Sequence, residues 1–309
     1  MRTNPQPEHE GPIHEPAMVP QVLRVLDPLP GRAALDVTVG TGGHSLAIAE
    51  ALGPGGRLVG LDADPRALRT ARARLQRWAP CRVRLFHGRF TDLPRILTDE
   101  GLTEFDLLLA DLGVGTHQLM QPERGFSFQS ESRLDMRYDP AAGPSAWDVV
   151  NTAERDELAD IFRRYGEERY SRAIAESICR RRREATVDTP AELAELVKRV
   201  YARRSPRDRT WRIHPATRVM MALRIHVNRE MEELDLLLKL IPRVLKRGGR
   251  AAVLTYHSLE ARRVKNAWRK QAEEGRLEEL PDSPLLPTEE QTERNPRVRS
   301  AQLRASRRL

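Results

Sequence analysis

A cluster of closely spaced glycines, followed by an aspartate, is the part of the sequence with the clearest chemistry. The mostly apolar residues 33–39 lead into Gly40, Gly42 and Gly43, and a second apolar run ends at Asp62. In open α/β sheets, a strand, a tight glycine turn and a helix bring the backbone close to a ligand. An acidic residue about twenty positions later can accept hydrogen bonds from both hydroxyls of a ribose. The pattern predicts a site for a cofactor that contains a nucleoside.

The glycine spacing argues against two phosphate-binding motifs. Ser45 stands where a G-x-G-x-x-G fingerprint counted from Gly40 needs its third glycine, and no Gly-Lys-Ser/Thr follows. Asp36, an acid within the strand before Gly-x-Gly, resembles instead the first motif of class I S-adenosylmethionine-dependent methyltransferases, although Thr38 replaces their usual first glycine. A glycine turn that only reverses the chain is the structural alternative.

Three further predicted strands, residues 83–86, 105–110 and 251–256, lead into side chains that can bind or react. These side chains are Phe90, Asp111, His257, Ser258 and Glu260. Because ligands of open α/β sheets bind outside the carboxyl ends of the strands, we expect these residues along one rim with Asp36 and Asp62. Phe90 can cover an adenine there or fill the core beneath the loop, and the sequence leaves both open.

The remaining patterns predict an α/β fold with a helical insertion. Residues 115–144 have the composition of an ordered loop, and residues 147–201 carry several amphipathic helices. A long helical pattern from residue 214 to 245 should end at Gly248-Gly249. Residues 275–294 look like a linker, and residues 300–307 alternate as a last edge strand would.

Length and composition favour one core domain that carries an insertion. The chain has 309 residues, of which 39% are hydrophobic. Cys81 and Cys179 form neither a disulfide framework nor a zinc site, which favours a reducing, cytoplasmic location. Without a run of eighteen uncharged apolar residues, we expect no membrane association.

Basic charge is concentrated in one segment. From Arg163 to Arg218 the chain carries sixteen Lys/Arg and eight Asp/Glu, which accounts for the whole net charge of +8. The other residues balance at 36 basic against 36 acidic. Such a segment is typical of a surface that binds phosphate backbones, and a solvated helix surface is the alternative.

Several ordered motifs together resemble one family. They are Gly42-Gly43-His44-Ser45, Asp62-Ala63-Asp64-Pro65, Asp111-Leu112-Gly113-Val114, Glu123-Arg124-Gly125-Phe126-Ser127-Phe128, Leu134-Asp135-Met136-Arg137, His214-Pro215-Ala216-Thr217-Arg218, His257-Ser258-Leu259-Glu260 and Asn295-Pro296-Arg297-x-Arg299-Ser300. From about His14 onward the sequence resembles the bacterial 16S (small-subunit) ribosomal RNA (cytosine-N4) methyltransferase family. The resemblance implies a class I, Rossmann-like methyltransferase sheet with a helical insertion domain.

The resemblance also implies a division of the chain. A flexible N-terminal arm, residues 1–13, would precede an S-adenosylmethionine-binding methyltransferase domain of residues 14–114 and 214–309. Residues 115–213 would form the loop and the helical insertion that recognises RNA. The expected partner is small-subunit ribosomal RNA or the assembled small ribosomal subunit, and a homodimer is left open.

Site residues follow by position in the motifs. The family's S-adenosylmethionine contacts fall on Gly42, Gly43, His44, Asp62, Phe90, Asp111 and Gln118. Asp111 is also a candidate acceptor for the target amine, and His257, Ser258 and Glu260 are rival acceptors or proton carriers that can instead brace the turn. No metal is expected.

Other expectations concern the target base and the departures from the family. Arg124, Phe126 and Phe128 are expected to stack on or clamp an unstacked base. The chain departs from the family at residues 115–117 and at Ala261. These departures leave open a methyltransferase that acts on another RNA or on a protein, and a non-catalytic RNA-binding assembly factor.

Overall fold

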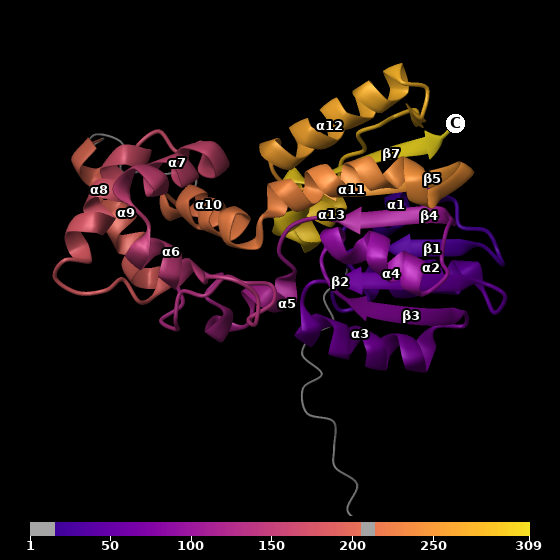
Figure 1. Ribbon diagram of the computed structural model, residues 1–309, viewed down its shortest axis with the longest axis horizontal. Coiled ribbons are helices and arrows are strands. Elements are labelled where there is room, and N and C mark those ends of the chain that lie inside the picture. The colour runs from indigo at the N-terminus through magenta and orange to yellow at the C-terminus, as the bar shows by residue number, and fades with distance from the viewer. Residues whose placement is uncertain (1–15, 205–213) are drawn as a thin grey trace, which may run out of the picture.

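A seven-stranded sheet forms the centre of the molecule in the computed structural model, which describes residues 16–204 and 214–309 (Figure 1). The expected flexible arm, residues 1–13, lies outside the described residues, as do the basic residues Arg207, Arg209 and Arg212. The strands are β1 (Ala33–Asp36), β2 (Arg57–Asp62), β3 (Arg82–His87), β4 (Phe105–Asp111), β5 (Leu245–Thr255), β6 (Leu277–Glu279) and β7 (Gln302–Arg308).

The order of strands across the sheet is β3-β2-β1-β4-β5-β7-β6. The five strands from β3 to β5 in this order are parallel, whereas β7 runs antiparallel to both of its neighbours, β5 and β6. The chain winds outward from β1 to β3 and then returns to β4 on the other side of β1, so the strand order reverses between β1 and β4. Open α/β sheets bind ligands at this switch point. The predicted α/β fold is confirmed.

Helices cover both faces of the sheet, and each face has its own apolar cluster. One cluster joins the strands to α4 (Leu93–Asp99), α11 (Glu230–Val244) and α12 (Ser258–Glu273). The other joins them to α1 (Val19–Leu26), α2 (Gly43–Leu52) and α3 (Pro65–Trp78). Because β1 and β4 are buried on both faces, their sequences read as continuous apolar runs rather than alternating ones.

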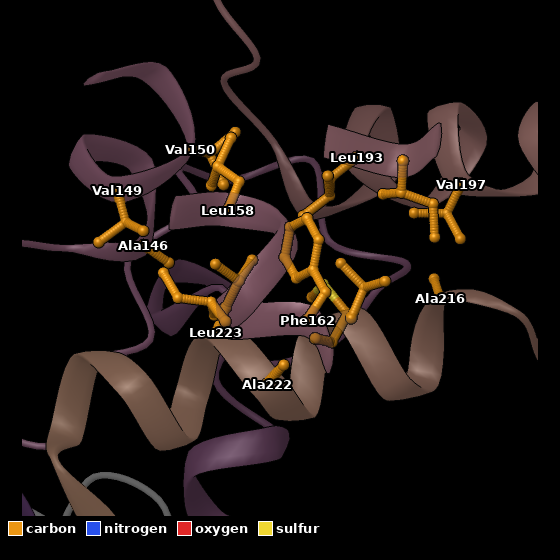
Figure 2. Packing of buried hydrophobic residues seen from close by; sticks show 14 of the residues in the cluster. Ala146, Val149, Val150, Leu158, Phe162, Leu193, Val197, Ala216, Ala222 and Leu223 are labelled. Atoms are coloured by element: carbon orange, nitrogen blue, oxygen red, sulfur yellow. The ribbon is translucent and has the colours of Figure 1, made fainter. Parts of the chain in front are cut away.

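A third apolar cluster lies beside the sheet and is built almost entirely from residues 126–231 (Figure 2). Its helices are α6 (Ala146–Thr152), α7 (Arg155–Gly166), α8 (Ser171–Arg181), α9 (Pro190–Arg204) and α10 (Ala216–Asn228). Phe162 and Leu223 are fully buried at its centre, where α7 packs on α10. In Figure 1 these helices form a lobe next to the carboxyl ends of the strands.

The long helical pattern from residue 214 to 245 is two helices rather than one. Arg229, between α10 and α11, has a left-handed φ of 54°, which breaks the helix. The predicted C-cap at Gly248-Gly249 is wrong, because both glycines lie inside β5, where its pairing with β4 shifts register. A Cβ on Gly249 would lie 3.0 Å from the Asp106 carbonyl oxygen, so close backbone approach explains that glycine.

Two expectations for the C-terminal part also need correction. Residues 275–294 are not a linker, because they contain β6 and the helix α13 (Glu289–Arg294). The last strand, β7, does not lie at the edge of the sheet but between β5 and β6. Over the described residues, no helix combines the length and the apolar character needed to cross a membrane.

Candidate active site

Asp62 presents a partly open carboxylate at the end of β2. The Gly40 amide donates to its Oδ2 atom at 2.6 Å, and the Asp64 amide donates to Oδ1 at 2.7 Å. A carboxylate has about four acceptor positions, so about two remain for a ligand. Burial raises the pKa of Asp62 to about 6, against the hydrogen bonds from the two amides.

The glycine turn between β1 and α2 packs against the protein on one side and is open on the other. Gly42 has a φ of 84°, and a Cβ on it would lie 3.3 Å from the Ala71 Cα atom. A Cβ on Gly43 would collide with Pro16. Gly40 has a φ of 54°, yet a Cβ on it would meet nothing within 4 Å. Gly42 and Gly43 are therefore needed for packing, and the open space lies beside Gly40 and Asp62.

Asp36 does not line this open space. Its carboxylate is fully buried and accepts hydrogen bonds from the Thr38 amide at 3.0 Å and the Ser45 hydroxyl at 2.6 Å. Burial raises the pKa of this carboxyl, which the two hydrogen bonds oppose. Asp36 therefore holds the turn against the start of α2. The expectation that it faces the rim is wrong, because both of its oxygens point into the protein.

Asp111 lies at the switch point, at the end of β4. The Tyr256 hydroxyl donates to its Oδ1 atom at 2.7 Å, and His44 Nδ1 lies 3.5 Å from its Oδ2 atom. The Asp111 amide donates to the Thr38 hydroxyl at 2.6 Å. Burial raises the pKa of Asp111, whereas His44 and the Tyr256 hydroxyl lower it. About a quarter of its side chain is exposed, so Asp111 is the partly open carboxylate on this side of the rim.

Both ring nitrogens of His44 face protein atoms. Nε2 lies 2.8 Å from the Ala17 carbonyl oxygen, which can only accept a hydrogen bond, so Nε2 carries the proton in that contact. Nδ1 faces Asp111. The His44 side chain, a predicted cofactor contact, lies between Ala17 and Asp111 in this structure.

A buried cluster around Asp64 ties the loop after β4 to the start of α3. The Asp64 side chain caps α3 by accepting from the Arg66 and Ala67 amides. Its Oδ2 atom also accepts from Gln118 Nε2 and from Arg124, both at 2.9 Å. Burial would raise the pKa of Asp64, but nearby His117 and these two donors lower it well below its usual range. Gln118, a predicted cofactor contact, is 5% exposed and is engaged in this cluster.

The expected base clamp is not formed by Arg124 and Phe126. Arg124 is 3% exposed, and its guanidinium also donates to the carbonyl oxygens of Arg137 and Tyr138. Phe126 is buried and stacks on Tyr138. Phe128 is half-buried and stacks on His214, with ring centroids 4.6 Å apart. The first two side chains are therefore covered by protein and cannot hold a base.

His257 and Glu260 begin α12 and contact each other. His257 Nδ1 accepts from the Glu260 amide at 3.4 Å, and its Nε2 lies 3.2 Å from Glu260 Oε1. Glu260 Oε2 accepts from the Tyr256 amide at 2.8 Å. Burial would raise the pKa of Glu260, but His257, Arg224 and the Tyr256 amide lower it. Ser258 is exposed and donates to Glu167 at 3.3 Å.

A buried ion pair behind Glu260 joins the helical lobe to the sheet. Arg224 on α10 donates to both oxygens of Glu230 on α11, at 2.8 and 2.9 Å. The Tyr138 hydroxyl donates to Glu230 Oε1 at 2.9 Å. Ligand atoms of Glu230, His257 and Glu260 lie within 4.8 Å of one another, a spacing that can hold a metal ion. The Arg224 guanidinium already balances these carboxylates, so we assign the cluster to structure.

Phe90 begins a short 3-10 helix, Phe90–Asp92, after β3. Its ring is partly buried and packs against the apolar cluster that includes α4 and α11. The same loop is fixed by Thr91, whose amide and hydroxyl donate to Glu233. Both roles of Phe90 left open by the sequence remain compatible with this position.

The residues around Asp62 suit S-adenosylmethionine. The cofactor's ribose needs acceptors for two hydroxyl groups, and Asp62 has about two acceptor positions left. The turn at Gly40 presents open space beside Asp62, which agrees with a ligand that lies close to the backbone there.

Sequence comparisons point to one family. A model described as the MraW methylase family matches residues 12–309. Ribosomal RNA small subunit methyltransferase H of Trichlorobacter lovleyi is 42% identical, over 96% of this chain and 98% of that protein. Its namesake in Thermomicrobium roseum is 43% identical over 96% and 94% of the two chains, and the one in a Cyanothece species is 46% identical over 96% and 95%.

Proposed function

Since the chain belongs to the MraW methylase family, we propose that it transfers a methyl group from S-adenosylmethionine to N4 of a cytidine in small-subunit (16S) ribosomal RNA. The full-length match to that family carries the proposal. The partly open carboxylates of Asp62 and Asp111, at the ends of the two strands that flank β1, support it, because they offer one group for a ribose and one for an amine.

Asp62 and the turn at Gly40 hold the cofactor in this proposal. The Asp62 carboxylate accepts from the ribose hydroxyls while the Gly40 and Asp64 amides fix its orientation. When bound, S-adenosylmethionine supplies a methyl group that its positively charged sulfur already activates. The protein therefore has to align the acceptor and exclude water rather than activate the methyl group.

Asp111 holds the target amine. A cytosine amine is a weak nucleophile because its lone pair is shared with the ring, and an acceptor for its N–H groups favours the geometry needed for attack. The Tyr256 hydroxyl fixes the Asp111 carboxylate, and the exposed part of this carboxylate accepts an N–H from the base. Its raised pKa also makes Asp111 a better acceptor for the proton that the methylated nitrogen loses.

His257 and Glu260 act as positioning residues in this proposal. Glu260 holds the Tyr256 amide, and Tyr256 in turn holds Asp111. Ser258 lies on the surface and contacts Glu167. We therefore favour the bracing role for these three residues over direct participation in proton transfer.

The helical lobe recognises the RNA. The proposed domain division assigns residues 115–213 to RNA recognition, and α10 packs in the same lobe although it lies beyond residue 213. The support for RNA recognition is the basic charge of the segment from Arg163 to Arg218. Because ribosomal RNA is made and modified in the bacterial cytoplasm, we propose that location. The small-subunit partner is part of the proposal, and a homodimer stays a prediction.

Transfer of a tritiated methyl group tests the function. Purified protein, labelled S-adenosylmethionine and small ribosomal subunits should give labelled N4-methylcytidine after digestion to nucleosides. Asp111→Asn should reduce the label at least about tenfold, because the amide loses the negative acceptor. Label in another nucleoside or in protein would support the alternative methyltransferases, and no label with intact RNA binding would support an assembly factor.

A further inference from the structure

We propose that helix α3 carries a second RNA-binding surface, on the methyltransferase side of the molecule. Residues 65–91 contain eight arginines and no aspartate or glutamate. The balance of 36 basic and 36 acidic residues outside the segment from Arg163 to Arg218 hides this concentration. The inference rests on the RNA substrate proposed above and adds a surface outside the helical lobe.

The arginines of α3 face away from the sheet. Ala67, Leu68, Ala71 and Leu75 are buried on one side of the helix, so the opposite side faces solvent. We use the name arginine face of α3 for Arg66, Arg69 and Arg77 on the solvent side, half-buried Arg74 at its border, and Trp78, which is exposed at the end of the helix. Residues 66 and 77 are about three helical turns apart and share a side, so the face is about 16 Å long.

Most of these charges are not balanced by the protein itself. Among the described residues, Arg69, Arg74 and Arg77 have no carboxylate within ion-pair distance. Arg66 contacts Glu123 at 3.4 Å, with both side chains largely exposed. A row of unpaired guanidinium groups attracts an extended polyanion, and planar guanidinium groups match phosphate oxygens in pairs.

An exposed aromatic ring favours RNA over an acidic protein as the partner. Trp78, the last residue of α3, is 58% exposed, and the Arg77 guanidinium lies 4.8 Å from its ring centroid. Exposed aromatic rings beside arginines are platforms on which unpaired bases stack. A surface built for carboxylate side chains would gain little from such a ring.

The arginine face begins at the candidate active site. Asp64 caps α3 and is bonded to Gln118 and Arg124, so the first turn of the helix is fixed to the loop after β4. From there α3 runs along β3 at the edge of the sheet (Figure 1). An RNA strand whose target base reaches Asp111 can therefore continue along α3 while the helical lobe holds its other side.

The test compares two triple variants that remove the same charge. The first variant removes three charges from the arginine face and combines Arg69→Gln, Arg74→Gln and Arg77→Gln. Arg95→Gln, Arg276→Gln and Arg294→Gln form the matched control, because each of these exposed arginines is paired with a carboxylate elsewhere on the molecule. Binding of transcribed small-subunit ribosomal RNA is measured over a range of salt concentrations, and S-adenosylmethionine binding is measured by calorimetry.

We expect the α3 variant to bind RNA about tenfold or more weakly than the control at about 150 mM salt. The slope of log affinity against log salt concentration should be shallower by about two to three, since each phosphate contact contributes about 0.7 on a single strand and about 0.9 on a duplex. Cofactor affinity should be equal in both variants. Trp78→Ala should weaken binding of a single-stranded oligonucleotide about fivefold with an unchanged salt slope.

Equal RNA affinity and equal salt slopes in the two triple variants would overturn the proposal. Unchanged affinity for naked RNA, with weaker binding of assembled subunits only, would also overturn it, because the partner would then be a ribosomal protein. If wild-type protein methylates no cytidine but the α3 variant still loses RNA affinity, the proposed reaction fails and the surface stands.

Discussion

The two halves of the candidate active site use their carboxylates differently. On the β2 side, two backbone amides are the hydrogen-bond donors to Asp62 within the described part of the chain, and the carboxylate keeps acceptor positions for a ligand. On the β4 and β5 side, Asp111 is held by the Tyr256 hydroxyl, and Glu260 by His257 and the Tyr256 amide. The buried pair of Arg224 and Glu230 lies behind them.

This difference separates the two tasks of the proposed enzyme. The cofactor half is built from about 25 consecutive residues, and Asp64 bonds it to Gln118 and Arg124 of the insertion. The acceptor half depends on α10, α11 and the loop at Tyr138. Substitutions that destabilise the helical lobe should therefore disturb the acceptor half before they disturb the cofactor half.

Removal of Arg224 should have the largest effect. Arg224→Met leaves Glu230 and Glu260 buried without their cation, and breaking such a pair costs about 3–5 kcal/mol of stability. Urea unfolding of the purified protein measures this loss. The double variant with Glu230→Gln should regain part of it, and a single variant as stable as wild type would show that the pair does not join the two regions.

Removal of the Asp62 carboxylate should have the second-largest effect. Asp62→Ala should weaken S-adenosylmethionine binding about 100-fold, or about 3 kcal/mol, because hydrogen bonds to a charged acceptor are lost. Calorimetry checks this, with Asp99→Ala as the control, since Asp99 is exposed and pairs only with Arg95 on its own helix. Undiminished affinity in the Asp62 variant would refute the ribose assignment.

The pH dependence of cofactor binding sharpens the comparison further. Because the Asp62 pKa is about 6, a ligand that bonds to the carboxylate form binds less tightly as the pH falls through that value. From neutral pH to about pH 5 the affinity should fall about tenfold. Asp62→Asn, which does not titrate, should show a flat profile. A wild-type profile that is equally flat would place the ribose elsewhere.

The sequence predicted the cofactor half better than the acceptor half. The glycine turn, β2 and Asp62 lie close together along the chain, so hydrophobic periodicity and residue spacing were enough to predict that they meet at one edge of the sheet. The prediction that Asp36 faces the rim was wrong because residue spacing does not show that Ser45 and Thr38 donate hydrogen bonds to its carboxylate. Thr38 stands where the motif usually has its first glycine. Its hydroxyl accepts a hydrogen bond from the Asp111 amide, which gives this threonine a structural role.

The acceptor half depends on contacts between distant parts of the sequence. Tyr256 was treated only as the last residue of a strand, and its hydroxyl reaches Asp111 across 145 residues. Arg124 occurs in a motif of surface-like composition, yet it is buried against Asp64, 60 residues away. Single-sequence patterns carry no signal for such pairs, although an arginine and an aspartate in separate loops are each a reason to look for a partner.

Cofactor affinity in two matched amide variants tests the division of the site most directly. Asp62→Asn and Glu260→Gln each replace one rim carboxylate by an amide of the same shape. We predict that Asp62→Asn weakens S-adenosylmethionine binding about tenfold or more, and that Glu260→Gln leaves it within about twofold while slowing methyl transfer. Equal losses of cofactor affinity in both variants would contradict separate cofactor and acceptor halves.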